Sequence, residues 1–585
     1  MMQAGETLSK ALNRLGFYTL MYPEYPSRIR GGDNSVLVVF SGEKYVAPVE
    51  KIDLLLAFGK ENFRKHEKEV EEPHFVRLSR TSRGKQEEQE GQGGPAFAGS
   101  NSATVGKQGY EAEELGLTKI ARELGNPLVA NTAGLGFIFK VLGFDLEVLE
   151  EQINEEFKGK EEILKLNLEA AKRGYESGEI GERREIGERR ERRKILNYSG
   201  NEALTEGILK AGCEFAAIYP MTPINSILTM LARPQTPERS DGGQARSKVQ
   251  LFRPEDEIAG IMSAIGASFA GKRSMVATSG GGFSLMIEGV SMAGMAEIPV
   301  VIVLGQRTGP STGMATFSSQ SDLNFAIYGG HGEFPRIVLT PGDIKESYLL
   351  GIKAFELAEK YQVPVILMTD KYLAESRFSG DEEELEVSKV SEVSKAPKDD
   401  VGAQRDAPVE YKRYEFTKDG ISLRLFPGQA VVMANSYEHD EKGFSSDDQE
   451  NRIRMMRKRM GKLRGLEGGF SFYKGQEEPE GQGTILVGWG STKEIILDFL
   501  RERNGFDFLH IYRPWPFPKG AIEVLQKYDE IIVIEGNYSG QLSDLIEKFT
   551  NKKVKRILKD DGRPFYRGDL HRFLADLHGS AKISL

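Results

Sequence analysis

Cysteine is almost absent from this sequence: among 585 residues, Cys213 stands alone. One thiol cannot form a disulfide within the chain, and it cannot by itself supply a thiolate zinc site or hold an iron–sulfur cluster. Long hydrophobic runs are also absent, since no apolar stretch reaches the ~18 residues that a membrane span needs. The amino-terminal sequence MMQAGETLSKALNRLG is polar and amphipathic, unlike a signal peptide. We therefore expect a cytoplasmic protein that does not bind a membrane.

An excess of positive charge is missing as well. The chain has 78 Lys and Arg against 87 Asp and Glu, a formal net charge of −9. It therefore has no overall basic field for nucleic acid, and we do not expect a nucleic-acid partner. The length predicts roughly three to five domains. Glycine, in contrast, is plentiful at 65 residues, which indicates many tight turns or close backbone contacts.

Three segments of low complexity divide the chain. Residues 77–112 are rich in Gly, Ser, Gln and charge, which predicts a flexible insertion. Residues 179–194 contain a tandem IGERRE repeat, and we interpret them as a solvated charged linker because Glu alternates with Arg. Residues 377–409 are predicted to be an acidic low-complexity linker. The remaining blocks are residues 1–178, 195–376 and 410–585.

Each block alternates short aliphatic runs with helix-like segments. Examples of the runs are SVLVVFSG in the first block, IPVVIVLG and VPVILMTD in the second, and GTILVGWG and YDEIIVIEG in the third. Helical patterns such as DEIAGIMSAIGASFAG lie between them. This alternation predicts a multidomain α/β protein with mostly parallel sheets covered by helices on both faces. Function in such folds is located at the carboxyl ends of the strands.

Thr222 lies between Pro220 and Pro223, after the run FAAIY and before the helix-like INSILTMLA. The prolines restrict the backbone and hold the Thr222 hydroxyl near a helix N-terminus, where an anion can bind. The alternative is an ordinary turn in which Thr222 or Ser226 caps the helix, and spacing alone favours the cap.

Glu257 begins a helix made almost entirely of small and apolar residues. An acid in the first turn complements the helix dipole, which is the simplest interpretation. However, a helix of this composition is predicted to be buried on most sides. The carboxyl group of Glu257 would then be partly desolvated and its proton affinity raised, which suits a group that shares a proton.

Arg307 follows the aliphatic run IPVVIVLG. An arginine at the end of a strand can bind a carboxylate through two N–H groups, and a surface arginine is the alternative. The nearby Gly280–Gly282 triplet, between a strand and a helix, resembles a phosphate-binding loop but lacks the Lys-Ser/Thr pair of such a loop. Close packing of the backbone is the alternative explanation for these glycines. His331 lies among glycines, where a histidine can be a general acid or base, and we favour the alternative of a loop histidine that caps a helix. His439 has no second histidine at ligand spacing, so a hydrogen-bonded turn is favoured over a metal site.

Taken together and in order, these motifs resemble the alpha subunit of 2-oxoacid:ferredoxin oxidoreductases with a gamma domain fused ahead of it. The resemblance covers nearly the whole chain and is closest to the 2-oxoglutarate type. It is carried by the following motifs: EYPSRIRGGDN, NPLVANTAGLG, GNEALTEGILKAGCEFAAIYPMTP, GQRTGPSTG, QSDLNFAIYGGHGEFPRIVLTP, YEHDEKG and EGNYSGQL.

The resemblance implies a domain for each block: a gamma domain at 1–178, a pyrimidine-binding domain at 195–376 and a transketolase C-terminal-like domain at 410–585. It also implies a reaction in which a 2-oxo acid and CoA give an acyl-CoA and CO2, and electrons pass to ferredoxin. The cofactor would be thiamine diphosphate, shared with a beta subunit that holds the diphosphate, Mg2+ and an iron–sulfur cluster. The assembly would be αβ or (αβ)2.

The resemblance further implies roles for individual residues. Glu257 would share a proton with the pyrimidine nitrogen N1′ of the cofactor, next to Pro220 and Pro223. Thr222 would donate its hydroxyl to the bound 2-oxo acid, and Arg307 would pair with the substrate carboxylate. Alternatives are a pyruvate or broad-specificity enzyme, a non-catalytic assembly paralogue, and another thiamine enzyme, although the chain has no diphosphate motif of its own.

Two features depart from the family pattern. The gamma domain normally begins with a strand and a G-x-G-G-Q-G turn, whereas this sequence starts at MMQAGETLSKAL. A phosphate or CoA role of this domain is therefore in question. Met221 stands where the family usually has Ile, and we expect this volume-conserving change to be harmless.

Overall fold

The structure is a computed structural model. It describes residues 1–27, 34–58, 60–70, 76–79, 112–178, 195–233, 249–381, 411–475 and 483–578. Most of the predicted insertion, the charged linker, nearly all of the acidic linker and both arginines of EYPSRIRGGDN lie outside these residues. The chain forms two compact units: unit 1 contains residues 1–23, 30–44 and 49–195, and unit 2 contains 24–29, 45–48 and 196–585. Among the described residues, no helix is long and apolar enough to cross a membrane.

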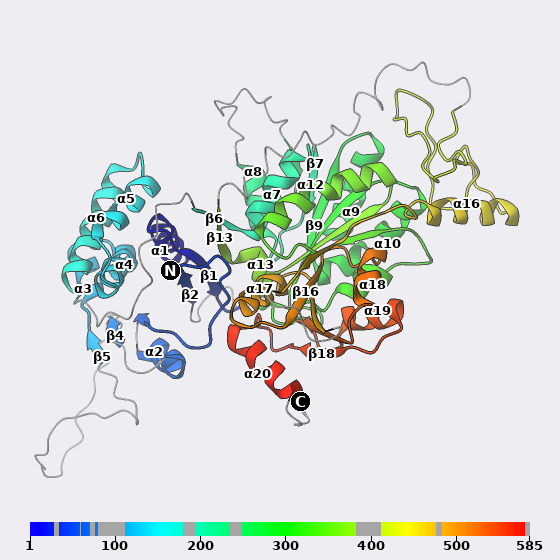
Figure 1. Ribbon diagram of the computed structural model, residues 1–585. Helices are drawn as coiled ribbons and strands as arrows, with labels where there is room; N and C mark the ends of the chain where they lie inside the picture. Colours follow the sequence, from blue (N-terminus) through cyan, green and yellow to red (C-terminus); the bar gives the residue numbers. More distant parts are fainter. Residues whose placement is uncertain are drawn as a thin grey trace, which may run out of the picture. The chain divides into compact units, whose positions relative to one another are not determined.

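Unit 1 combines short strands with a cluster of helices (Figure 1). Its strands are β1 (Tyr18–Glu24), β2 (Ser35–Ser41), β3 (Leu56–Phe58), β4 (Val76–Ser79) and β5 (Ala112–Glu114), and its helices are α1 (Met2–Arg14), α2 (Lys60–His66), α3 (Leu117–Glu123), α4 (Ala130–Val141), α5 (Leu146–Glu156) and α6 (Glu161–Glu176). Strand β2 pairs with β1, and β3, β4 and β5 form a parallel sheet. Helices α4 and α6 cross at Gly174, where an added Cβ would lie 1.8 Å from the Ala133 carbonyl oxygen. Only glycine permits this close helix contact.

A cavity of about 470 Å3 lies within unit 1. It touches the consecutive residues 34–40, which include most of β2, and 51–58, which include β3, together with one face each of α1 and α4. Successive side chains of a strand point to opposite faces, so a cavity that touches consecutive residues runs along the strand edge. Its lining is mostly aliphatic, with polar residues that include Asn62, His66 and Asn131.

Unit 2 contains a six-stranded sheet of order β11-β12-β10-β9-β7-β8, in which every pair is parallel. The strands are β7 (Phe215–Ile218), β8 (Gln250–Phe252), β9 (Ser274–Ser279), β10 (Val300–Gln306), β11 (Ile337–Leu339) and β12 (Pro364–Asp370). The helices are α7 (Gly200–Lys210), α8 (Asn225–Ala232), α9 (Glu257–Phe269), α10 (Gly280–Met295), α11 (Leu323–Tyr328), α12 (Ile344–Tyr361) and α13 (Lys371–Glu375).

Alternate side chains of β10 enter two different cores. Ile302 and Leu304 pack with α9 and α10, whereas Val301 and Val303 pack with α7, α8 and α12. Helices therefore cover both faces of the sheet, as the continuous aliphatic runs predict. The predicted α/β fold class is confirmed.

A second sheet of unit 2 has the order β14-β16-β15-β17-β18. Strand β14 (Phe470–Tyr473) is antiparallel to β16 (Phe506–Ile511), while β15 (Thr484–Gly488), β17 (Glu530–Glu535) and β18 (Lys555–Leu558) continue the sheet in parallel. Its helices are α17 (Thr492–Glu502), α18 (Lys519–Leu525), α19 (Gln541–Thr550) and α20 (Arg567–His578). Side chains of both sheets, among them Ile302 and Val487, belong to one core.

The ordered chain extends beyond residue 376, where the acidic linker was predicted to begin. Residues 377–381 form β13 (Arg377–Asp381), which pairs with β6 (Ile195–Ser199). The Arg377 guanidinium donates to Asn197 and pairs with Glu202. The start of the linker was thus predicted too early, because composition alone does not reveal this strand pairing.

Candidate active site

The strand order of the six-stranded sheet brings the predicted site residues to one edge. Arg307 follows β10, the glycine triplet follows β9, Thr222 lies in the turn after β7, and Glu257 follows β8. Because these four strands are neighbours and all parallel, their carboxyl ends meet at the same edge of the sheet. The sheet therefore gathers residues that are far apart in the sequence.

Thr222 and Arg307 are in direct contact. Nη1 of Arg307 donates to the carbonyl oxygen of Thr222 at 3.2 Å, and the Thr222–Pro223 peptide bond is cis. Gly305 lets this turn lie on β10, because an added Cβ would come within 2.7 Å of Ile224. Nε of Arg307 is buried and has no hydrogen-bond partner in the described part of the chain. The guanidinium is thus anchored at one nitrogen, with a second donor left for a ligand.

The helix after Thr222 is not capped by a side chain. Ile224 occupies the N-cap of α8 without a capping hydrogen bond. Ser226 instead accepts from Nδ2 of Asn201 at 2.8 Å, and the same amide nitrogen donates to the Pro223 carbonyl at 2.8 Å. The alternative in which Thr222 or Ser226 caps the helix is therefore wrong.

Glu257 is buried at the start of α9, where 5% of it is exposed. The N-cap role belongs to Asp256, whose side chain accepts from the Ala259 N–H at 2.8 Å. Glu257 packs against α10 at Gly282, where an added Cβ would lie 2.7 Å from its Oε1 and 2.1 Å from Oγ1 of Thr278. Among the described residues, no hydrogen bond or ion pair involves the Glu257 carboxylate. Glu257 is therefore a buried acid whose carboxylate does not cap α9.

Asp322 is a charged neighbour of Arg307 that sequence reasoning did not single out. Burial raises the pKa of Asp322 to about 6, and the Arg307 charge opposes this rise. Burial lowers the pKa of Arg307, and the negative charge of Asp322 opposes this decrease. The Asp322 carboxylate lies beside Gly280, at 2.7 Å from the position of an added Cβ. No spacing rule pairs an arginine with an acid in the following loop, so the sequence carries no clear signal for this contact.

The polar loop after β17 holds the segment that contains Asp322. The backbone N–H of Gln320 donates to the Gly536 carbonyl at 2.7 Å, and its side-chain oxygen accepts from the Gly536 N–H at 2.8 Å. Glu535 is fully buried and accepts from the N–H groups of Leu542 and Ser543. The EGNYSGQL motif therefore supports the site loop from the second sheet.

Three other residues of the sequence analysis lie elsewhere. Cys213 is a buried core residue, as predicted, and burial raises the pKa of its thiol to about 12. His331 is exposed, and its backbone N–H donates to Ser291. The His439 ring interacts with the Tyr437 carbonyl at 2.9 Å, which confirms the hydrogen-bonded turn. Within the described ranges, no group of three or more His, Cys, Asp or Glu side chains is placed to hold a metal ion.

The fold and this strand-end site are those of an α/β enzyme, and comparison with known proteins defines its class. Residues 206–458 match the family "Pyruvate flavodoxin/ferredoxin oxidoreductase, thiamine diP-bdg", and residues 1–177 match "Pyruvate ferredoxin/flavodoxin oxidoreductase". The class is therefore that of oxidoreductases with a thiamine-diphosphate-binding domain.

Individual relatives specify the family. The chain is 36% identical to the 2-oxoacid:ferredoxin oxidoreductase subunit alpha of Sulfolobus sp., over 98% of this chain and 94% of the relative. It is 32% identical to the 2-oxoglutarate synthase subunit KorA of Methanocaldococcus jannaschii, over 65% of this chain and 97% of the relative. A solved 2-oxoglutarate:ferredoxin oxidoreductase from Magnetococcus marinus, with 2-oxoglutarate, coenzyme A and succinyl-CoA bound, superimposes with a TM-score of 0.80 at 28% identity, over 98% of this chain and 96% of that one. The chain belongs to the 2-oxoacid:ferredoxin oxidoreductase alpha subunits.

Proposed function

We propose that this chain forms the pyrimidine side of a thiamine-diphosphate site in an enzyme that converts 2-oxoglutarate and CoA to succinyl-CoA and CO2 and reduces ferredoxin. The observation that carries the proposal is the buried carboxylate of Glu257, which has no partner among the described residues and lies at the sheet edge that also holds Thr222 and Arg307. The three residues come from segments far apart in the sequence. Their convergence supports one site.

The residues present fit the aminopyrimidine ring of the cofactor. A buried carboxylate without a partner among the described residues needs one from a ligand, and Gly282 lets this side chain pack closely against α10, because an added Cβ would lie 2.7 Å from Oε1 of Glu257. Glu257, with Pro220 and Pro223 nearby in the sheet-edge turns, would hold the ring. Thiamine diphosphate, when bound, supplies the carbanion chemistry of decarboxylation.

The chain's own residues orient the reactants. Glu257 would hold a proton at the pyrimidine nitrogen N1′ of the bound cofactor, a general acid–base role that suits its burial. Arg307 pairs with the substrate carboxylate through the donors that its contact with Thr222 leaves available. The Thr222 hydroxyl, which does not cap α8, donates to the 2-oxo acid. Because that carboxylate leaves as neutral CO2, Arg307 must orient the substrate without stabilising the ground state too strongly.

The substrate is assigned from the relatives. Those named for 2-oxoglutarate include the KorA subunit and the Magnetococcus marinus enzyme, whereas both matching family descriptions name pyruvate. The YEHDEKG motif resembles the 2-oxoglutarate type, so we favour 2-oxoglutarate. Pyruvate or broad specificity is the second candidate.

A partner subunit completes the site. Apolar side chains around the site are exposed at the ends of β7 and β8 and on α9 and α10, namely Tyr219, Phe252, Ile258, Met262 and Leu285. Exposed apolar clusters mark interfaces. We assign this surface to a beta subunit that carries the diphosphate site, Mg2+ and the iron–sulfur cluster, in an αβ or (αβ)2 assembly in the cytoplasm.

We assign the three blocks to the domains that the family resemblance implies. Residues 1–178 form the gamma domain, 195–376 the pyrimidine-binding domain and 410–585 the transketolase C-terminal-like domain. Unit 2 has two separate sheets, one of six and one of five strands, which supports the last two assignments.

The proposal is tested on the complex of this chain with its beta subunit, by 2-oxoglutarate-dependent reduction of methyl viologen. We expect Glu257→Gln to lower kcat by about 100-fold or more, because it removes a general acid–base group. The control is Glu255→Gln, an exposed acid two residues away, which should keep full activity. Full turnover of the Glu257→Gln complex would refute the role of Glu257.

A further inference from the structure

Helix α16 (Gln449–Gly461) is strongly basic within an acidic protein. Residues 449–464 contain seven Lys and Arg and a single acid, Glu450, whereas the whole chain has a net charge of −9. Figure 1 shows this helix in yellow at the periphery of unit 2. Such a local excess needs either internal counter-charges or a partner.

Part of this charge is neutralised inside the protein. Lys458 and Lys462 pair with the buried Glu297 at 2.7 and 2.5 Å, and Arg459 pairs with Glu438 at 2.7 Å. These ion pairs anchor α16 and the residue after it to Glu297, which follows α10, and to Glu438. The orientation of the helix is therefore fixed, and its opposite face is held outward.

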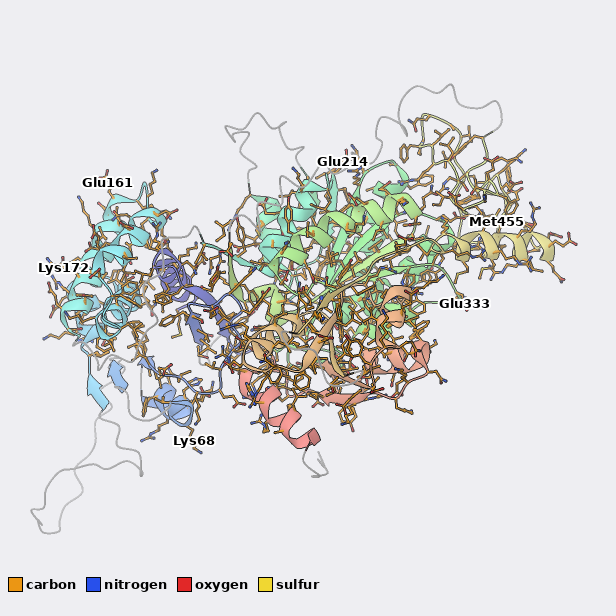
Figure 2. All side chains as sticks on the ribbon, viewed as in Figure 1. Lys68, Glu161, Lys172, Glu214, Glu333 and Met455 are labelled. Atoms are coloured by element: carbon orange, nitrogen blue, oxygen red, sulfur yellow. The ribbon has the colours of Figure 1, made fainter. Side chains whose placement is uncertain are left out.

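The outward face combines cations with apolar side chains. Ile453, Arg457 and Met460 follow the i, i+4, i+7 spacing of one helix face, and Ile453 and Met460 are 50% and 45% exposed. Arg457 and Arg464 have no carboxylate partner in the part of the chain that the structure describes. Figure 2 shows the side chains of α16, with the buried Met455 labelled. We call the residues Ile453, Arg457, Met460 and Arg464 the basic stripe.

The basic stripe differs from the apolar surface around the site. Permanent subunit interfaces are apolar and poor in charge, which fits the exposed side chains of α9 and α10. Transient electron-transfer contacts are small and steered by complementary charge, which fits Arg457 and Arg464, two exposed arginines without a carboxylate partner among the described residues. The stripe therefore suits an acidic protein that binds and leaves.

We propose that the basic stripe of α16 docks an acidic electron-carrier protein, the ferredoxin that accepts the electrons. This inference rests on the proposed function, since it needs an electron-accepting partner. Beyond the proposed function, the inference locates the surface of this chain to which the electron acceptor binds. A permanent subunit seated on the stripe is the competing occupant.

The test uses the complex of this chain with its beta subunit and an acidic [4Fe–4S] ferredoxin. We expect the double variant Arg457→Glu/Arg464→Glu to raise the KM for ferredoxin about tenfold and to weaken its salt dependence. Viologen reduction should stay unchanged, because the dye needs no docking site. The control is Arg503→Glu, which makes the same charge change per residue at another exposed position.

An equilibrium measurement of ferredoxin binding gives a second readout that needs no turnover. A Kd that rises for the double variant and not for the control supports the proposal, whereas equal Kd values overturn it. If the double variant no longer binds the beta subunit, the stripe is a permanent subunit interface, and the ferredoxin proposal is overturned. If the double variant does not fold, the Kd for ferredoxin is measured for Arg457→Gln/Arg464→Gln instead and is compared with the control in the same way. Failure of the proposed function can be told apart from failure of the docking proposal, because in that case the unmodified complex would not reduce viologen.

Discussion

At the scale of single residues, we propose that the guanidinium of Arg307 binds the substrate carboxylate. We expect Arg307→Lys to raise the KM for the 2-oxo acid by roughly 10- to 100-fold, because a lysine cannot offer two parallel donors. Steady-state viologen reduction by the complex measures this, with Arg253→Lys, an exposed arginine after β8, as control. An unchanged KM would contradict the role of Arg307.

Asp322 predicts a pH dependence of stability. Its pKa in the folded protein is raised from 3.8 to about 6, so the folded state favours the protonated form. The destabilising effect of the ionised carboxylate is absent below about pH 4, grows as the pH rises from 4 to 6, and is complete above that range. Asp322→Asn should therefore raise the free energy of unfolding at pH 7.5, by on the order of 2 kcal/mol, and change it little at pH 4.

Denaturant unfolding of the wild type and of Asp322→Asn at the two pH values measures this difference. Asp561→Asn, which alters an exposed carboxylate on the surface, is the control. If Asp322→Asn is stabilised equally at both pH values, the change in the free energy of unfolding does not come from ionisation of Asp322, and the prediction is wrong.

At the scale of elements, Gly282 permits a close contact between α9 and α10. An added Cβ at Gly282 would meet Thr278 at 2.1 Å and Glu257 at 2.7 Å, whereas at Gly281 the nearest atom is 4.0 Å away. We expect Gly282→Ala to destabilise the protein by about 1–3 kcal/mol through overpacking and to displace Glu257. Gly281→Ala should be neutral or stabilising, because alanine favours the helix.

Thermal unfolding and thiamine diphosphate binding by the complex measure both effects of the glycine substitutions. The prediction is wrong if Gly282→Ala and Gly281→Ala behave alike. The comparison is well matched, since the two glycines are neighbours in the first turn of α10.

At the scale of the whole molecule, the apolar surface around the site predicts dependence on a partner. We expect Leu285→Arg, at a side chain that is 51% exposed, to prevent assembly with the beta subunit, because it places a charge in an apolar interface. Size-exclusion chromatography of the co-expressed subunits measures assembly. Leu128→Arg, at an exposed leucine in unit 1, should assemble normally, and assembly of both variants would contradict the prediction.

Much of this architecture was predictable from local patterns. Aliphatic runs such as IPVVIVLG mark buried parallel strands because a strand covered on both faces has no polar side. Their carboxyl ends indicated the segments that contain Thr222 and Arg307, whereas roles for these two residues were implied only by the family resemblance. The order of motifs along the chain indicated the family, which the relatives confirm. The start of β13 was missed, because Arg377–Asp381 is held by its pairing with β6 rather than by its own composition.

By itself, the sequence determined the fold class, the family and the inability of this chain to hold an iron–sulfur cluster alone, since these follow from periodicity, motif order and a single cysteine. Only the tertiary structure decided which strand ends are neighbours, that Asp256 caps α9 whereas Thr222 caps no helix, and that Asp322 faces Arg307. The physical reason is that local spacing governs helices and strands, whereas strand order and buried charge contacts depend on packing between distant segments.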